Sequence, residues 1–157
     1  MDLKKAFEKV SEKPEFKGQK GYLTHACFIE EKNKDNSWEF GIFNPETKKI
    51  TVFESEPYKV REPDDALTEK DVVEELDFDL VKIGYPKALE IANAEAIKKN
   101  AKLIQKKIII LQKDKDLIWN ITFLTADFNI MNIKIDAVSG EVLSTDFHNI
   151  YDLGLRT

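Results

Sequence analysis

The sequence predicts an α+β fold made of two tandem modules, each with a helix packed on an antiparallel sheet. Residues 119–143 place apolar side chains two positions apart, which is the spacing of strands, and a tight turn interrupts them. Residues 3–10 and 86–99 instead repeat apolar side chains at helical spacing. The predicted boundaries are an N-terminal module at 1–54, an acidic linker with a short helix at 55–78, and a C-terminal module at 79–157.

Composition excludes several classes of protein. A net charge of −5 and a sequence pI near 5.2 argue against a nucleic-acid-binding protein, whose binding face is usually basic. No apolar run approaches the roughly 20 residues that span a bilayer. The N-terminus lacks the apolar core of a signal peptide, so we expect a cytoplasmic protein as the sequence stands, or an extracytoplasmic one if a leader was removed. Cys27 is the single cysteine, which excludes an intramolecular disulfide.

The first module begins with a helix. Leu3, Phe7 and Val10 form its apolar stripe, Asp2 is the expected N-cap, and Pro14 ends it. Three strands should follow, at residues 22–30, 38–43 and 50–54, with a polar turn at 44–49 between the last two.

The linker is predicted from a break in composition. Residues 54–79 hold 11 acidic residues against three basic ones, and residues 55–66 show no apolar period. Residues 68–71 resemble a capping box that opens a short helix ending at Leu76, and an extended segment is expected at 77–83. The acidic run lacks the glycine and distal glutamate of a calcium loop, so a solvated face is the better interpretation.

The second module repeats this order. A helix is expected from Pro86 to about Lys99, followed by a strand at 106–112, a turn at 113–116 and the strands of residues 119–143. Asp136 and Gly140 mark the last turn, because aspartate accepts backbone hydrogen bonds there and glycine takes a positive φ. The tail at 145–157 should pack back on the body for part of its length.

A duplication is suggested by the two halves, since each gives a helix, a strand and then a strand that opens with tryptophan (Trp38, Trp119). The turns at 44–50 and 136–142 both begin with a short polar residue that ends a strand and have a hydroxyl residue three positions later. The halves differ by one hairpin.

Residues 79–145 resemble the PepSY domain of peptidase propeptides and of the spore-germination protein YpeB. The resemblance rests on the helix at 85–92, the strand of Trp119, and residues 133–143, where a strand ends in an Asp-Ala turn followed by Gly-Glu. The first half departs from this pattern, because Asn44-Pro45 stands in place of Asp-Ala. The resemblance implies a PepSY/cystatin-like module without catalytic residues or cofactors, which binds or inhibits peptidases or holds other proteins.

Few side chains suggest chemistry. His25 and Cys27 share a strand face, but His148 is the only other histidine, so a zinc site is not expected and core packing is preferred. A Cys–His catalytic pair is also disfavoured, because no third group orients it. Lysines gather where the second helix meets its strand and could touch an anionic partner or complement the acidic run. These are Lys98, Lys99, Lys102, Lys106 and Lys107.

We therefore expect a non-catalytic protein-binding module that modulates or inhibits a peptidase, with no cofactor and no metal. The candidate partner-binding residues are Trp38, Trp119, Lys106 and Lys107, although core packing is the preferred interpretation of each tryptophan. Two other functions stay open at this stage. One is a small-ligand carrier or enzyme with a pocket between helix and sheet, and the other is a scaffold that dimerises by its sheet edges.

Overall fold

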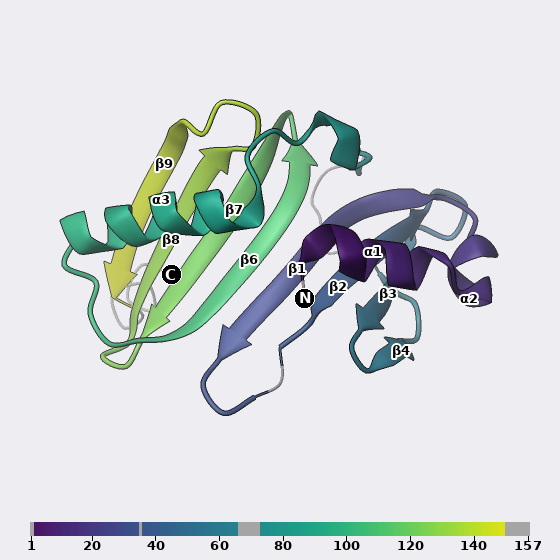
Figure 1. Cartoon of the computed structure of the whole chain (residues 1–157), viewed down its shortest axis with the longest axis horizontal. Coiled ribbons are helices and arrows are strands. Elements are labelled where there is room, and N and C mark those ends of the chain that lie inside the picture. Colours follow the sequence, from purple (N-terminus) through teal and green to yellow (C-terminus); the bar gives the residue numbers. More distant parts are fainter. Residues whose placement is uncertain (1, 35, 66–72, 150–157) are drawn as a thin grey trace.

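The computed structural model describes residues 2–34, 36–65 and 73–149. One antiparallel sheet runs through the whole of this chain, and two helices lie on the same face of it (Figure 1). The strands follow the order β4-β3-β2-β1-β6-β7-β8-β9, and β5 pairs with β3 beside β4. This confirms the expected α+β class with antiparallel strands. The sequence predicted two modules, each with its own sheet, whereas the strands of both halves form one continuous sheet.

The elements have the following bounds. In the first half they are α1 Leu3–Ser11, α2 Pro14–Lys17, β1 Tyr22–Glu31, β2 Trp38–Asn44, β3 Lys49–Ser55, β4 Tyr58–Val60 and β5 Asp64–Asp65. In the second half they are η1 Phe78–Leu80, α3 Tyr85–Lys98, β6 Ile104–Asp114, β7 Asp116–Thr125, β8 Asn129–Asp136 and β9 Val142–Asn149.

Helix α1 forms as the sequence predicts. The Asp2 carboxylate accepts a hydrogen bond from the backbone N–H of Lys5 at 2.9 Å, which satisfies one of the free donors at the helix start. Ala6 and Val10 are fully buried against the sheet, and Phe7 packs edge-on against Phe40 of β2. The predicted N-cap and apolar stripe are both confirmed.

Helix α3 lies on the second half of the sheet through small side chains. Ala88, Ala92 and Ala96 are at most 3% exposed, and their size lets the helix backbone approach β7 and β8 closely. Below them the strands supply large apolar side chains in strict alternation, as the period-two pattern predicts. The buried members are Trp119, Ile121, Phe123, Met131, Ile133 and Ile135.

The two halves are joined by strands in the middle of the sheet. β1 pairs with β6 in antiparallel register from His25 opposite Gln112 to Glu31 opposite Lys106. The hydrophobic core is continuous across this joint, because buried residues of both halves belong to one cluster.

The segment expected to be a linker contributes to the sheet. β4 pairs with β3 from Val60 opposite Phe53 to Tyr58 opposite Ser55, and β5 adds two more pairs. A strand of three residues is too short to show an apolar period, so β4 could not be predicted from periodicity.

The predicted helix at 68–76 falls mostly outside the described residues. Residues 73–77 form no helix, and Leu76 instead is 3% exposed and donates its N–H to the carbonyl of Leu23 at 2.8 Å. The extended segment expected at 77–83 contains the short helix η1, which Asp77 caps through the N–H of Asp79.

The C-terminal hairpin confirms the predicted turn and extends the predicted strand. The Asp136 carboxylate accepts from the N–H groups of Val138 and Ser139 at 2.8 and 2.9 Å, and Gly140 has φ +82°. β9 then continues to Asn149 and pairs with β8 except for a bulge at Leu143, although the sequence indicated a strand only to Leu143. The remaining tail residues lie outside the described range.

Candidate functional site

A cleft of about 600 Å³ opens on the helical face, where the two halves meet. Helix α1 contributes its first turn, α3 contributes Gly84, Tyr85 and Pro86, and η1 contributes Phe78. Both helices therefore begin at this cleft and run away from each other toward opposite ends of the molecule (Figure 1). The cleft lies between helices and sheet, which is where the sequence analysis placed a pocket if one existed.

Aromatic rings from both halves pack against one another beside the cleft. Trp38 of β2 and Trp119 of β7 lie with ring centroids 6.3 Å apart, and Tyr85 packs against both at 5.4 and 6.4 Å. The Trp119 Nε1–H donates to the carbonyl of Ile83 at 2.8 Å, so its polar atom is satisfied inside the protein.

The expectation that these tryptophans form a surface for a partner needs correction. Trp38 is 1% exposed and Trp119 is 0% exposed, so both belong to the core, the alternative that the sequence analysis kept open. The physical reason is that each occupies a core-facing position of a strand under a helix. Trp119 still borders the cleft, whereas Trp38 does not line it.

Lys106 and Lys107, the other two candidates, occupy opposite faces of β6. Lys106 forms an ion pair with Glu31 at 3.3 Å across the central joint. The Lys107 ammonium lies 5.5 Å from the ring centroid of Phe123. Their role toward a partner stays a prediction, and the structure gives each an internal contact.

The face of the sheet opposite the helices holds His25 and Cys27. They point the same way from β1, as the strand spacing predicts, and Gly41 lies opposite His25 on β2. Burial raises the pKa of the Cys27 thiol to about 12, with a further contribution from Glu39, so the thiol is protonated at neutral pH. Burial also lowers the pKa of His25, and the nearby Arg61 adds to this effect. Across the described ranges, no three His, Cys, Asp or Glu side chains lie close enough to hold a metal ion.

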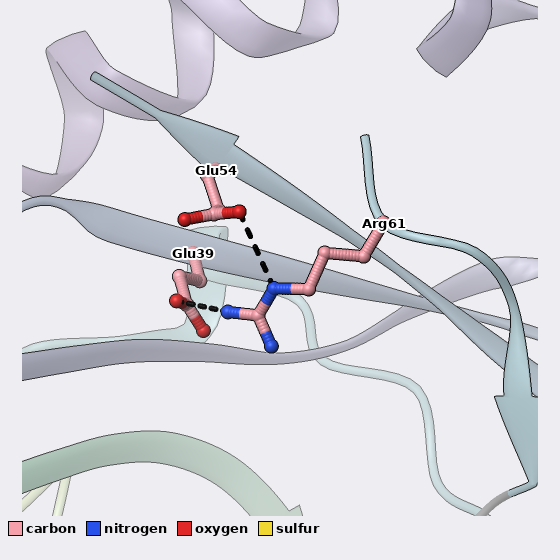
Figure 2. Close-up of polar contacts among 3 residues, drawn as sticks. All are labelled: Glu39, Glu54 and Arg61. Atoms are coloured by element: carbon pink, nitrogen blue, oxygen red, sulfur yellow. Dashed lines mark hydrogen bonds and ion pairs between the residues drawn. The ribbon is translucent and has the colours of Figure 1, made fainter. Parts of the chain in front are cut away.

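Arg61 connects three strands on this face. Its Nε donates to Glu54 of β3 at 3.3 Å, and its Nη2 donates to Glu39 of β2 (Figure 2). Its backbone N–H also donates to the carbonyl of Val52 at 2.9 Å. Because Glu39 and Glu54 are direct cross-strand neighbours, the guanidinium neutralises two carboxylates that would otherwise repel each other. In the sequence, Arg61 is one of the three basic residues of the acidic run that we expected to be solvated. No local pattern indicates that it pairs with Glu39.

The two outer edges of the sheet differ. β4 has three residues, and Pro57 and Pro63 flank it. β9 has eight residues, contains neither proline nor lysine, and pairs on one side only within the described chain. Natural edge strands are usually protected by being short, by proline, by lysine or by a β-bulge. β9 lacks the first three and is bulged at Leu143, so its regular exposed edge begins at Ser144.

Comparisons with known proteins agree with this fold. Residues 82–146 match the family model described as "PepSY: Peptidase propeptide and YPEB domain". The C-terminal half is PepSY-like. The PepSY-like region begins beside Ile83, covers α3 and β6 to β8, and ends within β9.

The likeness of the fold extends beyond the PepSY-like half. A crystal structure described as that of a "putative lipoprotein" from Clostridium difficile 630 superposes with a TM-score of 0.61, at 16% identity, over 94% of this chain and 93% of that chain. At this identity the likeness establishes the fold alone. No curated protein matches the sequence. None of the helices in the described ranges has the length and hydropathy of a bilayer-spanning segment.

Proposed function

We propose that this protein is a non-catalytic binding module that pairs an extended segment of a partner along β9, and that the partner is a peptidase. The observation that carries the proposal is the outer strand β9, which lacks proline and lysine and is regular from Ser144 onward, since an added strand would gain main-chain hydrogen bonds there. The PepSY-like half, to which β9 belongs, supports a peptidase as the partner class.

Two neighbouring proline variants test this edge. Successive N–H groups along a strand point to opposite sides, so of Thr145 and Asp146 one donates toward β8 and the other points away from the sheet. Thr145→Pro and Asp146→Pro should therefore differ in outcome. The variant at the position whose N–H points toward β8 loses a hydrogen bond of the sheet and is less stable. The other variant stays folded but lacks one N–H that could bond an added strand. Thermal denaturation identifies the folded variant.

The folded variant and the native chain are then used as bait in the source organism's lysate and culture medium. We expect the native chain to capture a peptidase and change its activity, and the folded variant to recover markedly less of it. Equal recovery by both would contradict pairing at β9. Recovery of other proteins but no peptidase would contradict the partner class.

We also propose that the chain is a fused pair of related modules. Each half consists of a helix followed by four strands, β1 to β4 and β6 to β9, and the sheet order reverses about the β1–β6 joint. Trp38 and Trp119 both lie in the second strand of their half. The turns at 44–50 and 136–142 are not counterparts in this scheme, because the first follows the second strand and the other follows the third.

The cleft favours a second candidate function, the binding of a small apolar ligand. Its volume of about 600 Å³ lies within the usual range for ligand sites, and half-buried apolar side chains such as Phe7, Phe78 and Tyr85 line it. A thermal-shift screen of small molecules tests it. A ligand that raises the midpoint of native protein but not of a Phe7→Glu variant would support the cleft, and equal shifts would argue against it.

A further inference from the structure

The loop that joins α3 to β6 exposes large apolar side chains at both of its ends. Ile97 is 76% exposed and Leu103 is 72% exposed, the highest values among the large hydrophobic residues of the described chain. The loop lies at the end of the molecule away from the N-terminal half (Figure 1). Exposed apolar side chains that occur together mark interaction sites more often than those scattered singly.

The backbone at Leu103 makes this residue choice more unusual. Its φ is +58°, in the left-handed region that glycine and asparagine tolerate and that bulky residues rarely adopt. Asn100, three positions earlier, has φ +55° and is a residue type suited to it. The carbonyl of Leu103 accepts the N–H of Ala126 at 2.9 Å, so the β7–β8 turn holds this conformation in place.

Leucine at position 103 is therefore unfavourable for the backbone and unfavourable in water. Its exposure means that burial in the protein does not compensate for either cost. Folding alone would be served better by asparagine or glycine. A contact with something outside the chain would account for both costs.

The charges between the two apolar side chains indicate what that contact is. Lys98, Lys99 and Lys102 are exposed along the loop. Lys98 pairs with Glu95 at 3.2 Å, whereas no carboxylate of the described chain forms an ion pair with Lys99 or Lys102. The nearby acidic residue Asp127, exposed on the β7–β8 turn, accepts a hydrogen bond from Thr125. The loop itself therefore carries more positive than negative charge, although the whole chain is acidic.

We propose that residues 97–103 dock on an anionic lipid surface. Ile97 and Leu103 enter the boundary between headgroups and acyl chains, while Lys99 and Lys102 contact the headgroup phosphates. Apolar side chains alternating with lysines are the composition of interfacial membrane-binding segments. A bilayer fits better than a protein partner because these apolar side chains project from a loop instead of lining a groove, and a bilayer needs no matching shape.

Co-sedimentation with vesicles tests the proposal. The probe is phosphatidylcholine vesicles with and without phosphatidylglycerol, and we expect the native chain to sediment only with the anionic ones. Leu103→Asn should weaken this binding about tenfold, because one leucine side chain no longer enters the lipid. The same variant suits the left-handed backbone, so its thermal midpoint should stay equal or rise, and unfolding cannot explain the loss.

Matched control variants distinguish binding by the loop from nonspecific hydrophobic or electrostatic binding to vesicles. Leu80 is 53% exposed outside the loop, and Leu80→Asn should leave vesicle binding unchanged. Lys99→Glu with Lys102→Glu should abolish binding to anionic vesicles, whereas Lys4→Glu with Lys5→Glu, an equal change of charge on α1, should weaken it far less.

Three results would overturn the proposal. They are absence of binding to any vesicle, equal binding by native chain and Leu103→Asn, and equal loss from Leu80→Asn. If vesicle binding is absent and Leu103→Asn instead lowers capture of a protein, the loop is a protein contact and the lipid proposal fails. The proline variants of β9 should bind vesicles normally, so failure of this inference is distinct from failure of the peptidase proposal.

Discussion

Single residues decide how closely β1 and β2 approach each other. Gly41 lies under the ring of His25, and a Cβ at position 41 would lie 2.1 Å from His25 Cε1. The glycine is therefore required by a close contact and not by an unusual backbone angle. The ring of His25 also receives support from Thr24, whose Oγ1 lies 2.9 Å from Nδ1.

Gly41→Ala tests this contact. We expect the free energy of unfolding to fall by about 1–3 kcal/mol, because the added methyl group overpacks a filled site. His25→Ala in the Gly41→Ala background should recover part of that loss, since it removes the clashing ring. Urea denaturation of both single variants and the double variant measures the coupling, and simple additivity would contradict the contact.

Asp136 is the second residue whose effect can be predicted. The N–H groups of Ser139 and Val138 lower the pKa of its carboxyl group by bonding the charged form. A lowered folded pKa gives stability that is present above the ordinary pKa and is lost as pH falls through the folded value.

We therefore expect Asp136→Asn to lower the free energy of unfolding by about 1 kcal/mol at pH 7. The difference from native protein should shrink as pH falls below 3.8, where the unfolded chain takes up the proton first, and should be lost once pH falls through the lower pKa of the folded carboxyl group. Denaturation curves at several pH values measure this. A difference that grows toward acid pH would contradict the assignment.

At the scale of elements, local chemistry explains what the sequence could predict. The Asp2 cap, the apolar stripe of α1 and the Asp136 turn were predictable, because each depends on residues within a few positions of one another. β4 carried no signal, since it is three residues long, and Glu39, which pairs with Arg61 directly after β4, lies on β2. The lysines of the α3–β6 loop were visible in the sequence, but the exposure of Leu103 depends on a backbone angle that sequence spacing does not reveal.

Arg61 holds β4 in the sheet, and Arg61→Gln should loosen it. We expect a loss of about 1 kcal/mol in stability, since the partners are partly exposed, together with faster amide exchange across β4. Adding Glu39→Gln should recover part of the loss by removing the repulsion from Glu54. High salt should reduce the effect of the single variant. Unchanged exchange in β4 would show that Arg61 is not its anchor.

At the scale of the whole molecule, the pairing of β1 with β6 could not be predicted from sequence periodicity. Alternation in Tyr22–Glu31 predicts a strand, but it does not say that the partner lies about 80 positions away in β6. A pocket between helix and sheet was one of the predicted alternatives, but its position was not predictable, because the cleft forms only where the starts of α1 and α3 meet. The burial of Trp38 and Trp119 likewise depends on that meeting.

The joint leads to a prediction about the isolated C-terminal half. Without β1, the 11-residue strand β6 becomes the edge of the sheet, and its own side chains Ile109 and Leu111, buried in the whole chain, lose part of their cover. We expect a fragment of residues 77–157 to form a homodimer in which β6 pairs with a second β6. Size-exclusion chromatography with light scattering measures this, and a folded monomer with a cooperative thermal transition would contradict it.

The arrangement of the two helices also affects the electrostatics of the molecule. A helix carries roughly half a positive charge at its start and half a negative charge at its end. Because α1 and α3 start at the same cleft and run apart, their dipoles oppose each other along the long axis. Their contributions to the overall dipole moment therefore largely cancel. The orientation of the molecule in the field of a charged surface is then set by its side chains, and the lysines at the far end of α3 carry more weight than the helix itself.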